Sequence, residues 1–427
     1  MLIRRGRLPD GQTADVRVDD HIVEIADTLD ALDNEQVLNA DGGAVLPGLH
    51  DHHLHLRAMA AALDSLAVGP PQVRTKAQLA QALATASPAP DGWIRAVGYH
   101  VSVAGELDRE QLDALIADTP LRIQHRSGAM WILNSAGLAR VGLADHPDGR
   151  LHSADDWSDA LPRRATALAD ITHRLSGYGV TGITDATPDL NADDIVTLMV
   201  ARRRGEIQQR LHFLAPGKRI LHDDRLDVDE LIAWVGDHHD DDVPVALHCV
   251  TEAQLVVALA ALRAAGVHPS DRIEHAAVVP DDMIADLLDL GVTVVNQPNF
   301  VAERGEHYLR DVPVEDQPHL WRVASLLRAG IPMAASTDAP FGGMDPWAAM
   351  RAAVQRTTAG GEVLGPDERV SADQALRLFF GHPDHPSVPR TVDVGQPGDL
   401  MVLTPTATVE TLASDMVAAT IVGGRLS

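Results

Sequence analysis

From residue 47 to residue 390 the chain alternates between short apolar runs typical of buried strands and longer segments with helical spacing. Leu255, Leu259 and Leu262, for example, follow the spacing of one apolar helix face. Such alternation implies parallel strands joined by helices, either in a closed (β/α)8 barrel or in an open doubly wound sheet. The strand-like runs are Val180–Thr184, Gln209–Leu214, Val243–His248, Arg272–His275, Val292–Val295 and Ile331–Ala335.

Several apolar runs end in a residue type that binds metal ions. His53 and His55 follow the run that begins at Pro47, His248 and His275 end two later runs, and Asp338 follows another. Residues i and i+2 of a strand leave the same face, so both imidazoles of an isolated His-x-His can reach one ion. A polar loop rich in histidine would also explain that pair alone, but not the later ligand-type residues. Barrel strands converge at their carboxyl ends, whereas an open sheet focuses a site at one switch point, so the pattern favours the barrel.

The two ends of the chain differ from its middle. Residues 1–46 and 391–427 contain short strand-like runs separated by turn residues, with little helical pattern. We therefore predict one small β domain formed by residues 1–46 and 391–427, and a barrel domain formed by residues 47–390.

Charge and cysteine content argue against several classes of function. The net charge of −26, from 35 basic and 61 acidic residues, opposes binding to nucleic acid or anionic membranes, because both need a basic face. Cys249 is the only cysteine, so no intrachain disulfide can form. We expect no signal peptide, because the first residues are not followed by a long enough apolar stretch, and no run approaches membrane-spanning length. We expect a cytoplasmic protein with a small-molecule substrate, and leave assembly into a homo-oligomer open.

Lysine is almost absent from this arginine-rich chain. Among the 35 basic residues only Lys76 and Lys218 are lysines, and Lys218 follows the strand-like run Gln209–Leu214. A lysine can lose its proton when it is buried near cations, whereas arginine cannot, and a neutral amine can take up carbon dioxide to form a carbamate. Lys218 is therefore a candidate bridge between two metal ions, with a chance surface lysine as the alternative.

The chain resembles the amidohydrolase superfamily, specifically its YtcJ-like metal-dependent hydrolases, over essentially its whole length. The resemblance implies a distorted α/β barrel of the (β/α)8 TIM-like type with a small β-sandwich built from both termini. The segments that carry it are Pro47-Gly48-Leu49-His50-Asp51-His52-His53-Leu54-His55, Leu247-His248, Arg272-Ile273-Glu274-His275-Ala276 and Ser336-Thr337-Asp338-Ala339-Pro340.

The resemblance also implies one or two divalent metal ions at the barrel mouth. Carried over residue by residue, His53, His55 and Asp338 hold the first metal, and His248 and His275 hold the second. Lys218, carboxylated by carbon dioxide, bridges them. Imidazole and carboxylate ligands favour zinc and also admit manganese, iron, cobalt or nickel.

This ligand set predicts a hydrolytic mechanism. A metal pair lowers the pKa of a shared water and polarises the substrate carbonyl. Asp338 then acts as the general base that takes a proton from the nucleophile and returns it to the leaving nitrogen. His275, the second predicted catalytic residue, hydrogen-bonds to the substrate if only one metal is present.

Residues in two segments are expected to shape the substrate pocket. The first segment is similar to a Gly-His-x-x-Trp-x-Asn-Ser motif of the family, although the Gly-His order is disturbed here. The second follows the predicted seventh strand, where barrel loops face the site. An ordinary loop or packing role is the alternative for each. The candidates are His125, Arg126, Trp131, Asn134, Gln297, Asn299 and Arg304.

We therefore predict a metal-dependent amidohydrolase that cleaves a carbon–nitrogen bond other than a peptide bond, as in an amide or N-acyl compound. One alternative is a mononuclear deaminase of the same superfamily, with His53, His55, His248 and Asp338 on a single metal. A lactonase or phosphotriesterase activity is another, because the ligands do not specify the bond that is cleaved. The last is a metal-free scaffold protein, which would be expected to have lost its ligands.

Overall fold

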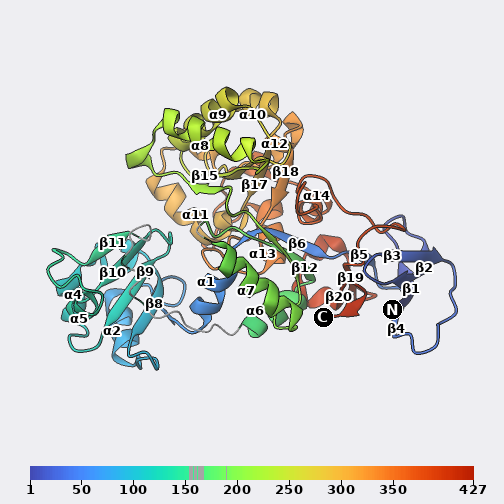
Figure 1. Cartoon of the computed structure of the whole chain (residues 1–427), viewed down its shortest axis with the longest axis horizontal. Coiled ribbons are helices and arrows are strands. Elements are labelled where there is room, and N and C mark those ends of the chain that lie inside the picture. Colours follow the sequence, from blue (N-terminus) through green and yellow to red (C-terminus); the bar gives the residue numbers. More distant parts are fainter. Residues whose placement is uncertain (153–156, 158–160, 162–167, 189) are drawn as a thin grey trace. The chain divides into compact units, whose positions relative to one another are not determined.

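The computed structural model describes residues 1–152, 157, 161, 168–188 and 190–427. The chain divides into two compact units (Figure 1). Met1–Leu56 and Leu168–Ser427 form the large unit, and Arg57–Ala167 form the inserted unit. The fold is mixed α/β.

Two parallel sheets of the large unit carry the predicted ligands. In the three-stranded sheet, β12 lies between β6 and β13, and the five-stranded sheet runs in chain order from β14 to β18. Backbone hydrogen bonds join the segments at the ends of β6 and β18, from Asp338 N to His53 O (2.9 Å) and from His55 N to Ala339 O (2.8 Å). The strands are β6 (Leu49–Leu54), β12 (Val180–Asp185), β13 (Arg210–Phe213), β14 (Lys218–Ile220), β15 (Ala246–Cys249), β16 (Arg272–His275), β17 (Thr293–Asn296) and β18 (Met333–Ala335).

Amphipathic helices connect these strands. Helix α9 buries Leu255, Leu259 and Leu262, as their spacing predicts, and it packs against β15 and α8. Helices α8, α9, α10 and α12 lie beside the five-stranded sheet in Figure 1. The helices of the large unit are α6 (Leu168–Gly177), α7 (Ala192–Arg203), α8 (Val228–Asp240), α9 (Glu252–Ala265), α10 (Met283–Leu290), α11 (Asn299–Asp311), α12 (Ala324–Ala329), α13 (Pro346–Gln355) and α14 (Ala372–Arg377).

Strands from both ends of the chain lie together. One four-stranded sheet has the order β3-β2-β1-β4, and another has the order β21-β20-β19-β5. They share a core that includes Ile3, Val16, Val45, Leu400 and Ile421. The boundaries 1–46 and 391–427 stay a prediction. The strands are β1 (Leu2–Arg7), β2 (Thr13–Val18), β3 (Ile22–Ala26), β4 (Val37–Asn39), β5 (Val45–Pro47), β19 (Leu400–Leu403), β20 (Val417–Val422) and β21 (Arg425–Leu426).

The predicted division into a terminal β domain and a barrel domain of residues 47–390 did not include the inserted unit. Its sheet has the order β11-β10-β9-β8-β7, and β9, β10 and β11 pair antiparallel, which sets them apart from the parallel strands of the large unit. The unit has a core of its own, around residues such as Leu79, Ile94 and Ile123. The elements are β7 (Leu66–Ala67), β8 (Ile94–Tyr99), β9 (Leu121–His125), β10 (Met130–Leu133), β11 (Arg150–His152), α2 (Lys76–Ala84), α3 (Val101–Ala104), α4 (Arg109–Asp113) and α5 (Ser135–Arg140), while α1 (Leu56–Leu63) lies at the junction.

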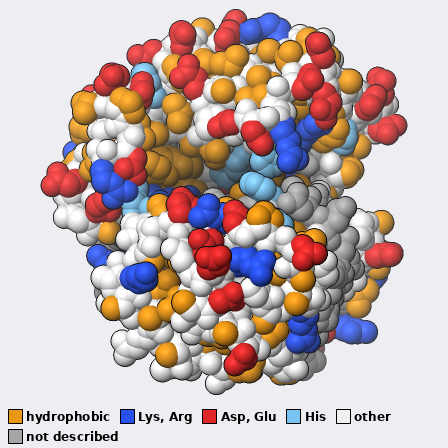
Figure 2. All heavy atoms as spheres, turned by 90° about the vertical axis from the view of Figure 1, so that its left-hand side faces the viewer, with side chains coloured by type: hydrophobic (Ala, Val, Ile, Leu, Met, Phe, Trp, Pro, Cys, Tyr) orange, Lys and Arg blue, Asp and Glu red, His pale blue; other side chains and the backbone are white. Residues whose placement is uncertain are grey.

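The chain has a net charge of −26. On the face drawn in Figure 2, basic side chains occur singly or in small groups among acidic ones. Within the part of the chain that the structure describes, no helix combines the length and apolar character that a membrane crossing requires.

Candidate metal centre

His53, His55 and Asp338 meet at the carboxyl ends of β6 and β18. Each offers a ligand atom, and these atoms lie within 4.8 Å of one another. The Oδ1 atom of Asp338 is 3.3 Å from His55 Nε2 and 3.6 Å from His53 Nε2. Two imidazoles and a carboxylate at this spacing can share one divalent cation.

Backbone geometry holds Asp338 toward this cluster. Its φ of 55° lies in the left-handed region, and His275 has a φ of 71°. For residues other than glycine this conformation costs on the order of 1–3 kcal/mol and clusters at functional sites. The hydrogen bond from Asp338 N to His53 O offsets part of that cost and ties the backbone of Asp338 directly to β6.

The second pair of predicted ligands lies beside the first. The ring of His275 is 4.8 Å from that of His53 and 4.4 Å from that of His248, measured between centroids. Burial lowers the pKa of His248 to about 3 and lowers the pKa of His53 and His275 well below the usual histidine value. These rings are therefore neutral near pH 7, the form in which an imidazole offers a lone pair to a metal.

Lys218 is buried and is the first residue of β14. The sequence had instead suggested that Lys218 lies at the end of the preceding strand. Burial lowers the pKa of its amine to about 8, with the opposing carboxylates of Glu274 and Asp338 limiting the shift. Its Nζ atom has no hydrogen-bond partner among the described residues, and the same holds for Asp338 Oδ1. A buried amine and a buried carboxylate oxygen without hydrogen bonds fit a site that a bound cation and its bridging group would complete.

Outer hydrogen bonds orient the histidines. His53 Nδ1 contacts a carboxylate oxygen of Glu274, and we assign the proton to Nδ1 so that Nε2 presents its lone pair toward Asp338. Glu274 is in turn held by Arg272, whose Nε donates to Oε1 at 2.6 Å. His275 Nδ1 lies 2.7 Å from Gln297 Oε1, and Gln297 donates to Ser336 Oγ at 2.8 Å.

The predicted pocket residues of the large unit have different roles. Gln297 is fully buried and orients His275. Asn299 donates to the Thr337 carbonyl (3.0 Å), and Arg304 donates to the Phe341 carbonyl (2.7 Å). Both contacts brace the segment that carries Asp338 and continues to Phe341, whose ring lies 5.2 Å from that of His55. Substrate contact by these residues stays a prediction.

The other four pocket candidates belong to the inserted unit. Asn134 caps α5 and uses its whole amide within that unit, accepting from Leu121 N and Gly137 N and donating to two carbonyls. These bonds give Asn134 a structural role, and its contact with substrate stays a prediction. Trp131 is buried in a cluster with Trp93 and Leu133, which also favours packing. For His125 and Arg126 substrate contact stays a prediction.

Sequence reasoning missed the outer partners of the ligands. Glu274 is the most important, because it connects a ligand on β6 to Arg272 on β16. The available signal was a charged pair inside a short run otherwise typical of a buried strand. Such a pair is rarely buried unless each member finds a partner.

These residues form a candidate metal centre at the carboxyl ends of parallel strands. The sequence matches the model of the Amidohydrolase family over residues 36–427, so the chain belongs to this family. The superfamily predicted from the sequence motifs is thereby confirmed, as is the prediction of an amidohydrolase enzyme.

Several known proteins similar to this chain are hydrolases by name. It is 25% identical over 465 residues to an N-substituted formamide deformylase from Arthrobacter pascens, covering 87% of this chain and 85% of the relative. An uncharacterized metal-dependent hydrolase from Pyrococcus furiosus has a TM-score of 0.70 and 18% identity, covering 95% of this chain and 99% of that chain. N-isopropylammelide isopropylaminohydrolase from Burkholderia multivorans has a TM-score of 0.56 and 15% identity, and the match covers 100% of this chain and 97% of that chain. Atrazine chlorohydrolase from Arthrobacter aurescens, complexed with zinc, has a TM-score of 0.52 and 16% identity, and the match covers 100% of this chain and 94% of that chain. These structures support an α/β TIM-like fold.

Proposed function

We propose that this amidohydrolase cleaves a carbon–nitrogen bond other than a peptide bond in a small molecule, and that its substrates are amides or N-acyl compounds. The observation that carries the proposal is the cluster of His53, His55 and Asp338, which lies next to the unpartnered amine of Lys218. The similarity to a formamide deformylase makes N-substituted formamides the first compounds to test.

His53, His55 and Asp338 would hold one metal ion, and His248 and His275 a second, with carboxylated Lys218 between them. We take zinc as the first candidate, since neutral imidazole and carboxylate ligands suit it. When bound, the metal supplies Lewis-acid activation of water and of the scissile carbonyl. We infer further that the two parallel sheets close into a (β/α)8 barrel and that the terminal sheets form a β-sandwich. The proposed location is the cytoplasm.

The protein's own groups would then move the proton. Asp338 Oδ1 is buried and accepts no hydrogen bond from the described residues, so it can accept a proton from the attacking water. The same carboxylic acid would return the proton to the leaving nitrogen, which departs as a neutral amine. Gln297 fixes the ring of His275 and Glu274 fixes that of His53, so neither ligand needs to reorient during the reaction.

A mononuclear deaminase is the second candidate. It is favoured by the fact that, among the described residues, only His53, His55 and Asp338 meet as a set within 4.8 Å, which is a ligand set for one ion. In that case His275 would hydrogen-bond to the substrate. Metal content separates the two candidates, because the first requires two ions per chain.

The test combines elemental analysis with hydrolysis assays on N-substituted formamides, N-acyl amino acids, cyclic amides, lactones and aminopurines. Asp338→Asn should abolish most turnover, and Asp242→Asn is the matched control. Both aspartates have a positive φ, of 55° and 58°, but the Asp242 side chain is 96% exposed. Equal activity of the two variants would overturn the assignment of Asp338. Turnover of lactones or aminopurines alone would overturn the proposed substrate class.

A further inference from the structure

A separate cavity of about 80 Å³ lies where the two parallel sheets meet. Its lining includes His212 and Phe213 on β13, Pro244 before β15, Ser270 before β16, and Arg272 at the start of β16. The predicted ligands His248 and His275 lie at the opposite ends of β15 and β16. The cavity is therefore distinct from the candidate metal centre.

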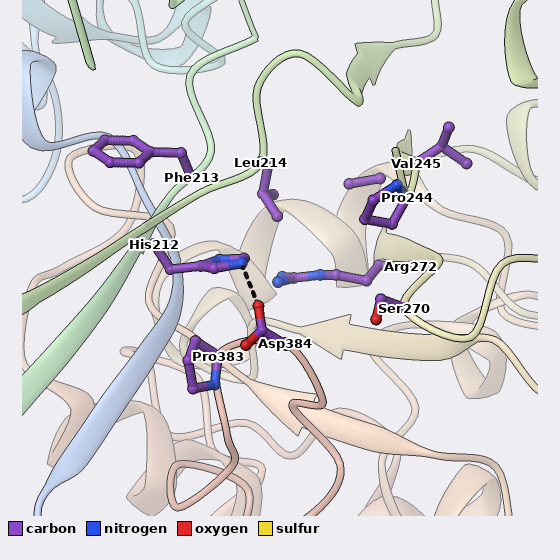
Figure 3. A pocket seen from close by; sticks show the side chains of 10 residues that line it. His212, Phe213, Leu214, Pro244, Val245, Ser270, Arg272, Pro383 and Asp384 are labelled. Carbon is purple, nitrogen blue, oxygen red and sulfur yellow. Dashed lines mark ion pairs between the residues drawn. The ribbon is translucent and has the colours of Figure 1, made fainter. Parts of the chain in front are cut away.

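Arg272 supplies an unsatisfied charged donor to this cavity. Its side chain is 3% exposed, and its guanidinium points toward His212 and Asp384 in Figure 3. The Nε atom donates to Glu274 Oε1 at 2.6 Å, and NH2 donates to the His52 carbonyl at 2.7 Å. NH1 is buried and has no hydrogen-bond partner among the described residues. A buried guanidinium nitrogen without an acceptor is costly, so a missing acceptor is expected there.

His212 supplies a second unsatisfied nitrogen. Its Nε2 atom lies 3.2 Å from Asp384 Oδ1, the contact drawn as a dashed line in Figure 3. Its Nδ1 atom is buried and also lacks a partner within the described part of the chain. With Asp384 at Nε2, a protonated His212 can donate from Nδ1 to an acceptor in the cavity.

The cavity is lined by charges of both signs, the buried guanidinium of Arg272 and the carboxylate of Asp384. Burial lowers the pKa of His212 to about 4, and the charge of Arg272 acts in the same direction, so the ring is neutral near pH 7 when the cavity holds no anion. The nearby carboxylate of Asp384 opposes this lowering of the pKa, but its side chain is 73% exposed and hence well solvated. A bound anion would raise this pKa, so its binding would be coupled to uptake of the proton that Nδ1 donates.

We propose that this cavity is a binding site for a small monovalent anion, either a halide or a one-carbon carboxylate, held by Arg272 NH1 and His212 Nδ1. One water molecule needs only about 10–15 Å³ of such space, so the cavity has room for an ion of this size. An organic anion with several carbons would not fit. A cavity filled only by water is the competing explanation.

Crystals of the metal-loaded protein soaked in sodium bromide provide the direct test. We expect anomalous density for bromide in the cavity, next to Arg272 and His212. Density for water alone in the cavity, with bromide bound only at the surface, would overturn the proposal.

Thermal unfolding of the metal-loaded protein tests one-carbon carboxylates. Sodium formate is titrated at constant ionic strength, balanced with sodium gluconate, whose anion is too large for the cavity. We expect a saturable rise in Tm of about 2 °C, because a ligand that binds only the folded state stabilises it. The rise should disappear in His212→Phe, which removes the ring nitrogens and retains an aromatic ring.

His146→Phe is the matched control. His146 also pairs with an aspartate, Asp148 at 3.4 Å, and its side chain is 26% exposed, as is that of His212. It belongs to the inserted unit and is not among the residues that line the cavity. The formate effect should persist in this variant. An unchanged formate effect in His212→Phe, or the same rise in Tm with gluconate, would contradict binding in the cavity. If His212→Phe does not fold, the bromide experiment remains decisive.

Discussion

Replacing Glu274 by glutamine should weaken metal binding through His53 without removing any ligand. Glu274 is 0% exposed and contacts both His53 Nδ1 and the guanidinium of Arg272. Glutamine has nearly the same shape but carries no charge. The substitution therefore removes the negative charge that polarises His53 and balances Arg272.

Two energies change, and they can be measured separately. Breaking a buried ion pair by removing one partner costs about 3–5 kcal/mol, and we expect the lower end because glutamine keeps some hydrogen bonds. Loss of the outer carboxylate partner of a ligating histidine lowers metal affinity by about 10–100-fold, or ~1.4–2.8 kcal/mol. The first energy appears in the metal-free protein, whereas the second appears only in the binding constant.

The measurements are urea unfolding in the presence of a chelator and zinc competition with a chromophoric chelator. Glu368→Gln is the matched control, since Glu368 is 3% exposed and pairs with buried Arg322 at 3.2 Å. The other partners of Glu368 are Ser325 and the Val323 amide. Both variants should lose stability, but only Glu274→Gln should lose zinc affinity. If the two variants bind zinc equally well, Glu274 does not tune the metal centre.

Four further predictions concern the centre and the inserted unit. The double variant His53→Ala and His55→Ala should lose metal and activity but keep its circular dichroism spectrum; wild-type metal content by elemental analysis would contradict the ligand assignment. Lys218→Arg should hold at most one metal per chain, because a guanidinium cannot form the carbamate bridge, and two retained metals would exclude that bridge. Asp338→Asn should lower kcat by about 10²–10⁴-fold with substrate binding largely retained, as expected for a positioned base; a comparable loss of binding alone would point to a different role. Asn134→Ala should destabilise the protein by about 1–3 kcal/mol, because it leaves buried backbone groups unpaired, and unchanged metal content would agree with a purely structural role.

Local patterns in the sequence were enough to find strands and candidate ligands. The run Arg272–His275 is β16, and Val180–Thr184 differs from β12 by one residue at its end. These patterns are reliable because buried parallel strands read as continuous apolar runs, which end where the chain leaves the sheet. The ligand-type residues at those ends were visible for the same reason.

The inserted unit shows where local patterns failed. Its antiparallel strands β9 and β10 are separated only by residues 126–129, and they were read as part of one long alternation. Hydrophobic periodicity identifies strands and helices, but it does not say which strands share a sheet. That grouping follows from which apolar faces pack together in a common core.

The sequence by itself determined the class of protein and the chemical types of the ligands, since both depend on residue identity and strand period. Only the tertiary structure decided which groups orient those ligands. Glu274 lies 221 residues from His53, and Thr337 lies 286 residues from Asp51, to whose carboxylate it donates a hydrogen bond. Such pairs form because strands distant in the chain become neighbours on folding, and the free energy of each contact depends on burial that no local pattern records.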